Sequence, residues 1–323
     1  MAVSWPDKSR IFFVASCYLL SNFFTSAFFP LLDNRVFVIL SKDPRFSKEL
    51  FGRQRLFGTL GQSLIQLATG KAFRSIGFDA MFLYLIASAV VFILLIQFGI
   101  PNEASPSPLK DDKKGSLLAG SRKLLWTFDF PFFLLILLIA STTRGVAGNF
   151  LPQYYSTVMK LSPWELSLMM QTRLFTELAT FFFSKQIIQC IGVGWMLFIA
   201  QFSGFLRVFA YSVIPPTYPW TRAPLLIELL KGVNNACLTS AGIQYIHDSA
   251  PVGTEATAQG FYSGVHSYLA NATAGLFSGW VLFAHKEDPN AYYALFSYTA
   301  LLAATGIIFY SVHRVYKVHR VLS

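Results

Sequence analysis

Charged residues are scarce in this chain: Asp, Glu, Lys and Arg together make up only 13% of its 323 residues. An average soluble domain carries about 25%, so the composition argues against a large soluble protein. Hydrophobic residues fill the difference, at 54% of the chain with 33 phenylalanines among them. This balance predicts an all-α, polytopic membrane protein, whose chain crosses the bilayer several times.

Cysteine is also rare, and the short motifs of metal sites and hydrolases are missing from the sequence. Cys17, Cys190 and Cys237 show neither CxxC nor Cys/His spacing, so we expect no disulfide framework, no metal and no cofactor. The GxGD, HExxH and GxSxG patterns are absent as well, which argues against an intramembrane enzyme.

Acidic residues are outnumbered by basic ones, 16 to 26, which gives a formal net charge of +10. The cations lie between apolar runs instead of along one solvated face, so the excess does not indicate nucleic-acid binding. Lys and Arg in short loops mark the cytoplasmic side of a membrane protein. Fourteen lie in one set of expected loops and seven in the other. This bias predicts a non-cytoplasmic N-terminus and a cytoplasmic C-terminus.

Apolar runs long enough to cross a bilayer, about 20 residues, dominate the chain. We expect nine, at roughly 11–40, 56–73, 78–99, 130–152, 164–189, 193–214, 224–248, 256–284 and 291–313. A charged, Pro- and Ser-rich stretch separates the first three from the last six. The expected organisation is a partial N-terminal bundle at 1–100, a cytoplasmic linker at 101–125, a six-helix bundle at 126–314 and a cytoplasmic tail at 315–323.

Several charged residues lie deep within these runs, namely Arg144, Arg173, Glu177, Arg207, Glu228 and Lys231. A charge exposed to hydrocarbon is costly, so we expect these side chains to face the interior of the bundle. Arg173 and Glu177 are spaced i,i+4, and Glu228 and Lys231 are spaced i,i+3, so each pair can neutralise itself. Two interpretations stay open: internal ion pairs that hold helices together, or a polar cavity that binds a solute or protons.

The run 256–284 raises similar alternatives. A single membrane histidine such as His266 either makes a helix–helix hydrogen bond or carries protons. The GxxxG spacing of Gly275 and Gly279 predicts close packing against another helix.

The segment FGRQRLFG, Phe51 to Gly58, places Arg53 and Arg55 where an apolar run begins. These cations are either topology anchors at the cytoplasmic face or part of a buried polar site. Together with the preceding PLLD, which ends at Asp33, the segment resembles the major facilitator superfamily. The similarity is to the branch related to the lactose permease, also called major-facilitator-like or domain-containing-protein-6-like. In that branch an acidic residue late in helix 4 faces an arginine at the start of helix 5.

The C-terminal half carries more of this resemblance. The segments TELATFFFSKQIIQCIG (176–192), FLRVFAYSVIP (205–215), IELLKGVNNACLTSAGIQYIHDSAP (227–251) and TEATAQGFYSGVHSYLANATAG (254–275) are similar to helices 8, 9, 10 and 11 of the branch. The resemblance implies a major facilitator fold that lacks helices 1–3, so that the nine runs correspond to helices 4–12. Because both halves build the cavity of such a transporter, a second interpretation is a non-transporting membrane scaffold or an inactive relative.

The resemblance implies a secondary transporter that moves a small polar solute, with protons, between two rocking bundles. By the same resemblance, Asp33 and Arg55 form a charge pair in the N-terminal bundle, and Glu177 and Arg207 couple solute to protons in the C-terminal one. Further candidates for the cavity are Glu228, Lys231, Asn235, Gln244 and His266. The expected partners are the solute, protons, the lipid bilayer, and a second copy or another protein that completes the N-terminal bundle.

Overall fold

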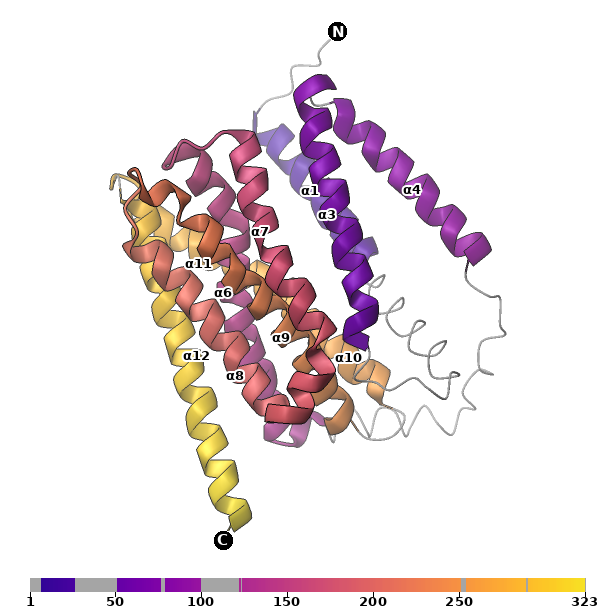
Figure 1. The fold of residues 1–323 in the computed structure, drawn as a ribbon, viewed down its shortest axis with the longest axis vertical. Coiled ribbons are helices and arrows are strands. Elements are labelled where there is room, and N and C mark those ends of the chain that lie inside the picture. Colours follow the sequence, from indigo (N-terminus) through magenta and orange to yellow (C-terminus); the bar gives the residue numbers. More distant parts are fainter. Residues whose placement is uncertain are drawn as a thin grey trace.

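The computed structural model describes residues 7–26, 51–76, 79–99, 122, 124–250, 254–288 and 290–322. Within these ranges the regular elements are all helices, as Figure 1 shows. Among the described residues, three helical segments are long and apolar enough to cross a membrane: Asp129–Thr157, Ser184–Val213 and Ala291–Tyr316. The all-α membrane class is therefore confirmed, and the count of nine spans stays a prediction.

Three helices form the N-terminal part: α1 (Asp7–Ser26), α3 (Phe51–Ile76) and α4 (Asp79–Gly99). They fall on the first three expected runs, although residues 27–50, with the second half of the first run, lie outside the described ranges. The helix α3 packs beside α4 and against α7 (Pro163–Phe182). Gln171 of α7 donates a hydrogen bond from Nε2 to Oε1 of Gln66 on α3, at 2.8 Å. This contact joins the N-terminal and C-terminal parts of the molecule.

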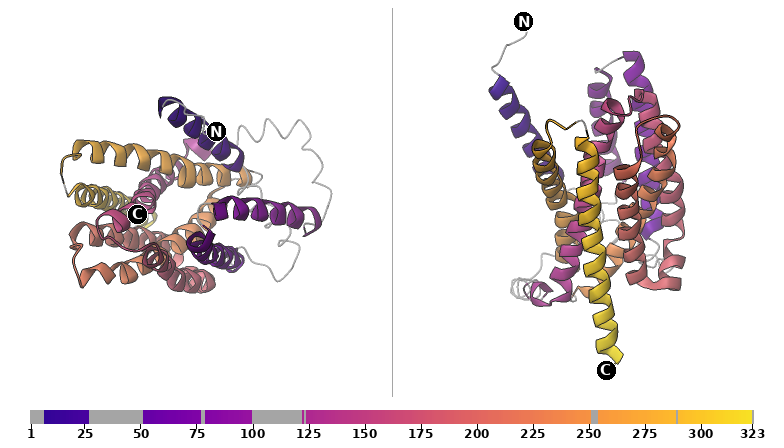
Figure 2. Two further views of the ribbon diagram at one scale, coloured as in Figure 1. Left: turned by 90° about the horizontal axis from the view of Figure 1, so that it is seen from above. Right: turned by 90° about the vertical axis from the view of Figure 1, so that its left-hand side faces the viewer.

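The C-terminal part is a bundle, seen from above and from the side in Figure 2. Besides α7 it contains α6 (Asp129–Thr157), α8 (Ser184–Val213), the short η2 (Trp220–Arg222), α9 (Pro224–Ser249), α10 (Glu255–Ser263), the π-helical segment η3 (Gly264–Leu269), α11 (Ala270–Ala284) and α12 (Ala291–Leu322). The helix α9 packs against both α7 and α8, α12 packs against α6 and α8, and α11 packs against α6. The three helices α7, α8 and α9 are therefore close neighbours.

The boundary expected between the runs 164–189 and 193–214 coincides with a break at Gly192, and a further break lies earlier in the chain. The helix α7 already ends at Phe182, and Gly192, with φ 80° and ψ 161°, separates two helical segments within α8. Only glycine adopts such backbone angles without steric cost. The stretch between the two points mixes the polar residues Ser184, Lys185 and Gln186 with Ile187 and Ile188, which pack against the buried core, so hydrophobicity alone does not mark the earlier break.

The expected tail, residues 315–323, is helical up to Leu322, because α12 continues past the end of the apolar run. The sequence contains neither proline nor glycine after Gly306, so nothing in it stops the helix once the apolar run ends. In Figure 1 the last turns of α12 extend past the rest of the bundle, with the C-terminus at the tip.

The glycines of the GxxxG spacing are not at a helix crossing in the described part of the chain. A Cβ added at Gly275 or Gly279 would meet no atom within 4 Å, so the packing prediction for them is wrong. The close approach of α6 and α11 occurs at Gly145, where an added Cβ would lie 2.9 Å from the Cβ of Ala274. Spacing places small residues on one face of a helix but does not determine which face meets a neighbour.

Candidate functional site

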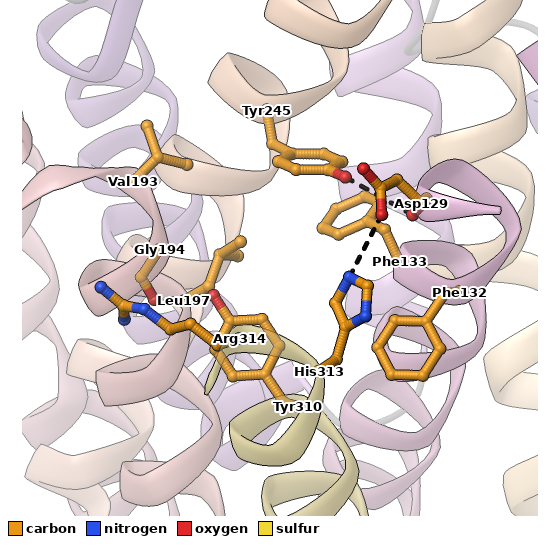
Figure 3. A pocket seen from close by; sticks show the side chains of 10 residues that line it. All are labelled: Asp129, Phe132, Phe133, Val193, Gly194, Leu197, Tyr245, Tyr310, His313 and Arg314. Carbon is orange, nitrogen blue, oxygen red and sulfur yellow. Dashed lines mark hydrogen bonds and ion pairs between the residues drawn. The ribbon is translucent and has the colours of Figure 1, made fainter. Parts of the chain in front are cut away.

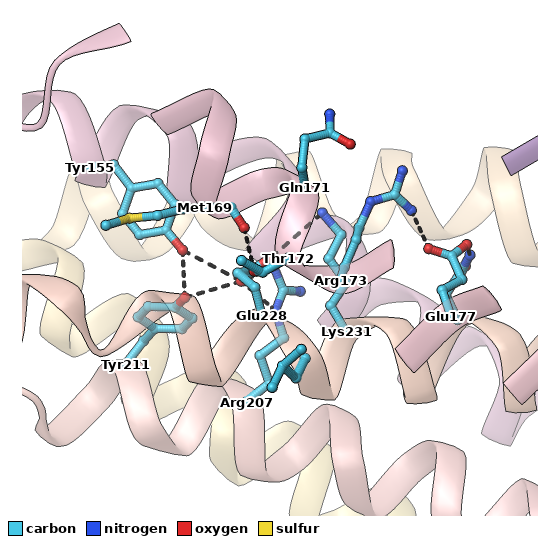
Figure 4. Close-up of polar contacts among 12 residues, drawn as sticks. Tyr155, Met169, Gln171, Thr172, Arg173, Glu177, Arg207, Tyr211, Glu228 and Lys231 are labelled. Atoms are coloured by element: carbon cyan, nitrogen blue, oxygen red, sulfur yellow. Dashed lines mark hydrogen bonds and ion pairs between the residues drawn. The ribbon is translucent and has the colours of Figure 1, made fainter. Parts of the chain in front are cut away.

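A buried carboxylate, Glu228, lies in the second turn of α9 with only 1% of its surface exposed. Arg207 of α8 holds both of its oxygens: Nε donates to Oε1 at 2.9 Å and Nη2 donates to Oε2 at 3.1 Å. One turn further along α8, the hydroxyl of Tyr211 donates to Oε1 at 3.0 Å. A two-pronged contact of this kind is the strongest arrangement of arginine and carboxylate. It neutralises both charges inside the bundle (Figure 4).

A second tyrosine joins this group from α6. The hydroxyl of Tyr155 is hydrogen-bonded to that of Tyr211 and lies 3.4 Å from Oε1 of Glu228. Both tyrosine side chains are fully buried. Three helices, α6, α8 and α9, therefore converge on one carboxylate. The sequence analysis missed both tyrosines because aromatic residues are common throughout the chain. The only available signal was the i,i+4 spacing of Arg207 and Tyr211.

The other buried carboxylate, Glu177 of α7, is likewise 1% exposed. Nη1 of Arg173, one turn earlier on the same helix, donates to its Oε2 at 2.6 Å. Nδ2 of Asn235 on α9 donates to its Oε1 at 2.7 Å. The i,i+4 ion pair that the spacing allows is thus formed, and Asn235 connects it to the helix that carries Glu228.

A glycine lets these two carboxylates lie along the same helix–helix contact. A Cβ added at Gly232 of α9 would lie 2.2 Å from the carbonyl oxygen of Arg173 and 2.2 Å from Oγ1 of Thr176. The same hydroxyl of Thr176 donates to the carbonyl of Leu229 at 2.6 Å. No side chain larger than hydrogen fits there, so Gly232 permits the close approach of α7 and α9.

Lys231 stands at the edge of this group. Its Nζ lies 3.8 Å from Oε2 of Glu228, and 17% of its side chain is exposed. The sequence analysis proposed Lys231 as the partner that neutralises Glu228. In the structure that role belongs to Arg207, whose contacts with the carboxylate are shorter and involve both oxygens. The i,i+3 pair exists, but as the weaker of the two contacts.

A separate polar group connects α6 to the π-helical segment η3. Oγ of Ser141 and Nδ1 of His266 share a hydrogen bond of 2.7 Å, and the ring of Tyr262 stacks on the imidazole with centroids 5.3 Å apart. Nη2 of Arg144 donates to the carbonyl oxygen of His266 at 3.0 Å. Single-turn π segments within α-helices are frequent at functional sites.

The candidate residues named from the sequence fall into three sets. Glu177, Arg207, Glu228, Lys231 and Asn235 lie together in the group shared by α7, α8 and α9. Gln244 does not join them, because its Nε2 binds Asp248 one turn further along α9, at 3.1 and 3.2 Å. His266 belongs to the separate group on α6 and η3. Asp33 and the side chain of Arg55 lie outside the described residues.

A pocket of about 280 Å³ lies elsewhere in the bundle, between α6, α8, α9 and α12 (Figure 3). Its wall includes Phe132, Phe133 and Leu197, and its main polar contact is the 3.3 Å pair of His313 Nε2 with Asp129 Oδ1. Asp129 begins α6, whereas Tyr155 lies near the end of that helix. The pocket and the Glu228 group therefore occupy opposite halves of the bundle, and only the Glu228 group concentrates buried charge.

The chain matches the model of a known family. The model of the MFS_1 like family matches residues 1–294. The matched range contains α1 through α11 and the start of α12, and with them every residue of the two polar groups.

Proposed function

Because the chain belongs to the MFS_1 like family, and so to the membrane transporters of the major facilitator superfamily, we propose that it is a secondary active transporter of a small polar solute, driven by protons. The segments quoted from the sequence favour the branch related to the lactose permease. The observation that carries the proposal is the buried ionic group formed by Arg173, Glu177, Arg207 and Glu228. Charges inside a membrane protein are costly and typically mark a solute or proton path.

The position of this group suits a transporter that alternates between two openings. The helix α7 carries the ion pair of Arg173 and Glu177, and through Gln171 it also contacts α3 of the N-terminal part. In transporters of this type, two groups of helices rock against each other around a site near the middle of the membrane. Movement of α3 against α7 would therefore alter the surroundings of Arg173 and Glu177 directly.

The ion pairs also provide a way to couple solute to protons. Each buried carboxylate is balanced by one arginine, Glu228 by Arg207 and Glu177 by Arg173. A solute that competes for an arginine leaves the carboxylate without its counter-charge. An unpaired charge in the interior costs several kcal/mol, so the carboxylate then takes up a proton. Proton uptake and solute binding thereby become linked.

Uptake into liposomes tests this proposal. The purified full chain is reconstituted, a pH gradient is imposed, and a panel of labelled polar solutes is offered. We expect one solute to accumulate and the accumulation to vanish when a protonophore collapses the gradient. Glu228→Gln keeps the shape of the side chain without its charge and should abolish accumulation. Glu287→Gln, at an exposed position, is the matched control. A panel in which no solute responds to the gradient would contradict the proposal.

A further inference from the structure

The buried polar residues of the C-terminal part carry more positive than negative charge. In the described interior of α6 to α9 the cations are Arg144, Arg173, Arg207 and Lys231, and the carboxylates are Glu177 and Glu228. Four cations thus face two carboxylates, an excess of two positive charges. Such an excess is costly in surroundings that water reaches poorly, unless an anion compensates it.

Both carboxylates are already fully engaged. Glu228 accepts from Arg207 through both oxygens and from Tyr211 through one. Glu177 accepts from Arg173 on one oxygen and from Asn235 on the other. Each carboxylate is thus neutralised by one arginine. The two cations left over are Lys231 and Arg144.

Neither remaining cation is well satisfied. The ammonium of Lys231 is 3.8 Å from an oxygen of Glu228 that Arg207 already holds, and part of its side chain is exposed, so a solute can reach it. Arg144 donates through Nη2 to a backbone carbonyl, while its buried Nε has no hydrogen-bond partner. Arg144 belongs to the separate group on α6 and η3, so Lys231 is the cation left over beside Glu228.

We propose that the transported solute is a small organic anion, with a carboxylate or phosphate group, and that Lys231 binds this charged group. The inference rests on the proposed function, since it names the class of solute for the same site. Lysine and arginine suit such a group because they supply several N–H donors and no acceptor. Movement of a monovalent anion together with one proton also carries no net charge across the membrane, so the membrane potential does not oppose it.

The first test is binding to the full chain in a neutral, lipid-free detergent. The unfolding temperature is measured with matched probes that differ in charge: glucose, gluconate and glucose 6-phosphate, and likewise lactamide and lactate. A ligand that binds only the folded protein raises the unfolding temperature. We expect an anionic probe to do so and its neutral counterpart to have no effect. The inference is overturned if the neutral probes raise the unfolding temperature, or if no probe of either kind raises it.

Variants identify the residues involved. Lys231→Gln should weaken the apparent affinity for the anionic probe at least tenfold, whereas Lys231→Arg, which keeps the charge, should retain it. Lys160→Gln removes a cation at an exposed position and serves as the control. If Lys231→Gln binds the anion as well as the unchanged chain does, Lys231 is not its ligand and the inference fails.

A lipid headgroup also carries a phosphate group, so the experiment includes separate samples that test binding of lipid. Phosphatidylglycerol and phosphatidylcholine are added in separate samples. Stabilisation by phosphatidylglycerol alone, without any soluble anion, would overturn the inference and assign Lys231 to lipid. Uptake then separates the two proposals. Anion binding without gradient-driven accumulation would refute the transporter and keep the anion site. Accumulation of a neutral solute alone would keep the transporter and refute the anion.

Discussion

Arg207 of α8 holds Glu228 of α9 by two hydrogen bonds of 2.9 and 3.1 Å, although the two residues are 21 positions apart in the sequence. Both side chains are buried. A buried ion pair contributes little compared with an apolar pair of the same shape, but loss of one partner alone leaves an uncompensated charge. We therefore expect that the effects of substituting Arg207 and Glu228 on the free energy of unfolding do not add.

We expect Arg207→Met to lower the free energy of unfolding by about 3–5 kcal/mol, because Glu228 then stays buried without its main counter-charge. Glu228→Leu should cost a similar amount. The double variant should be more stable than either single one, because both charges are gone. Chemical or thermal unfolding of the four proteins in detergent measures this. Arg222→Met, at an exposed position, should change stability by less than about 0.5 kcal/mol. If the loss of stability in the double variant equals the sum of the losses in the two single variants, Arg207 and Glu228 do not form a tight pair.

Gly232→Ala should separate α7 from α9. The new Cβ would lie 2.2 Å from the carbonyl oxygen of Arg173, so the helices must move apart and the hydrogen bond from Asn235 to Glu177 is lost. Overpacking of this kind typically costs about 1–3 kcal/mol, which an unfolding curve detects. Gly148→Ala is the matched control, since its Cβ would meet no described atom within 4 Å. Equal stability of the two variants would show that the contact is looser than described.

His266→Gln distinguishes the two interpretations of this histidine. Because Nδ1 of His266 is hydrogen-bonded to Ser141 and its ring stacks on Tyr262, we expect a structural role. The substitution should then lower stability by about 0.5–1.5 kcal/mol, as for one net hydrogen bond. The pH dependence of uptake should not change. A shifted pH profile with unaltered stability would instead indicate a proton carrier. His285→Gln, near the end of α11, serves as the comparison.

The predicted orientation is open to a labelling experiment. The distribution of Lys and Arg predicts an external N-terminus and a cytoplasmic C-terminus. Lys160→Cys, between α6 and α7, and Lys185→Cys, at the start of α8, should then lie on opposite sides when each is made in a chain whose three own cysteines are replaced by serine. A membrane-impermeant thiol reagent should label Lys160→Cys in intact cells and Lys185→Cys only after permeabilisation. Terminal tags on the same side of the membrane would contradict the odd number of spans.

We expect the chain to associate with a second copy or with a partner protein. Every side chain of α1 whose burial is described is exposed, and α1 makes no extensive contact with another element of the described part. Helices in membranes hold their positions by close packing against other helices, so a helix as exposed as α1 suits an interface with another chain. Light scattering of the detergent-purified chain gives its mass. A stable monomer that accumulates solute on a pH gradient would refute this expectation.

The apolar runs predicted the helices well because membrane-like segments must satisfy their backbone groups internally, which leaves the helix as the simplest structure. The run 224–248, for example, corresponds to α9, Pro224–Ser249. Helix ends and the limits of apolar runs do not coincide everywhere. The break at Phe183 lies inside one expected run, and α12 continues beyond its apolar run because no residue there stops it.

For the candidate site, the sequence by itself determined which charges lie inside and that Arg173 can reach Glu177, since one turn of helix fixes that spacing. Only the tertiary structure decided that Arg207 holds Glu228, that Tyr155 joins them and that Lys231 is left with a weaker contact. Those contacts cross between helices, so they depend on how far each helix is rotated and shifted against its neighbour. Local sequence patterns do not contain that information, because it is set by packing along the whole interface.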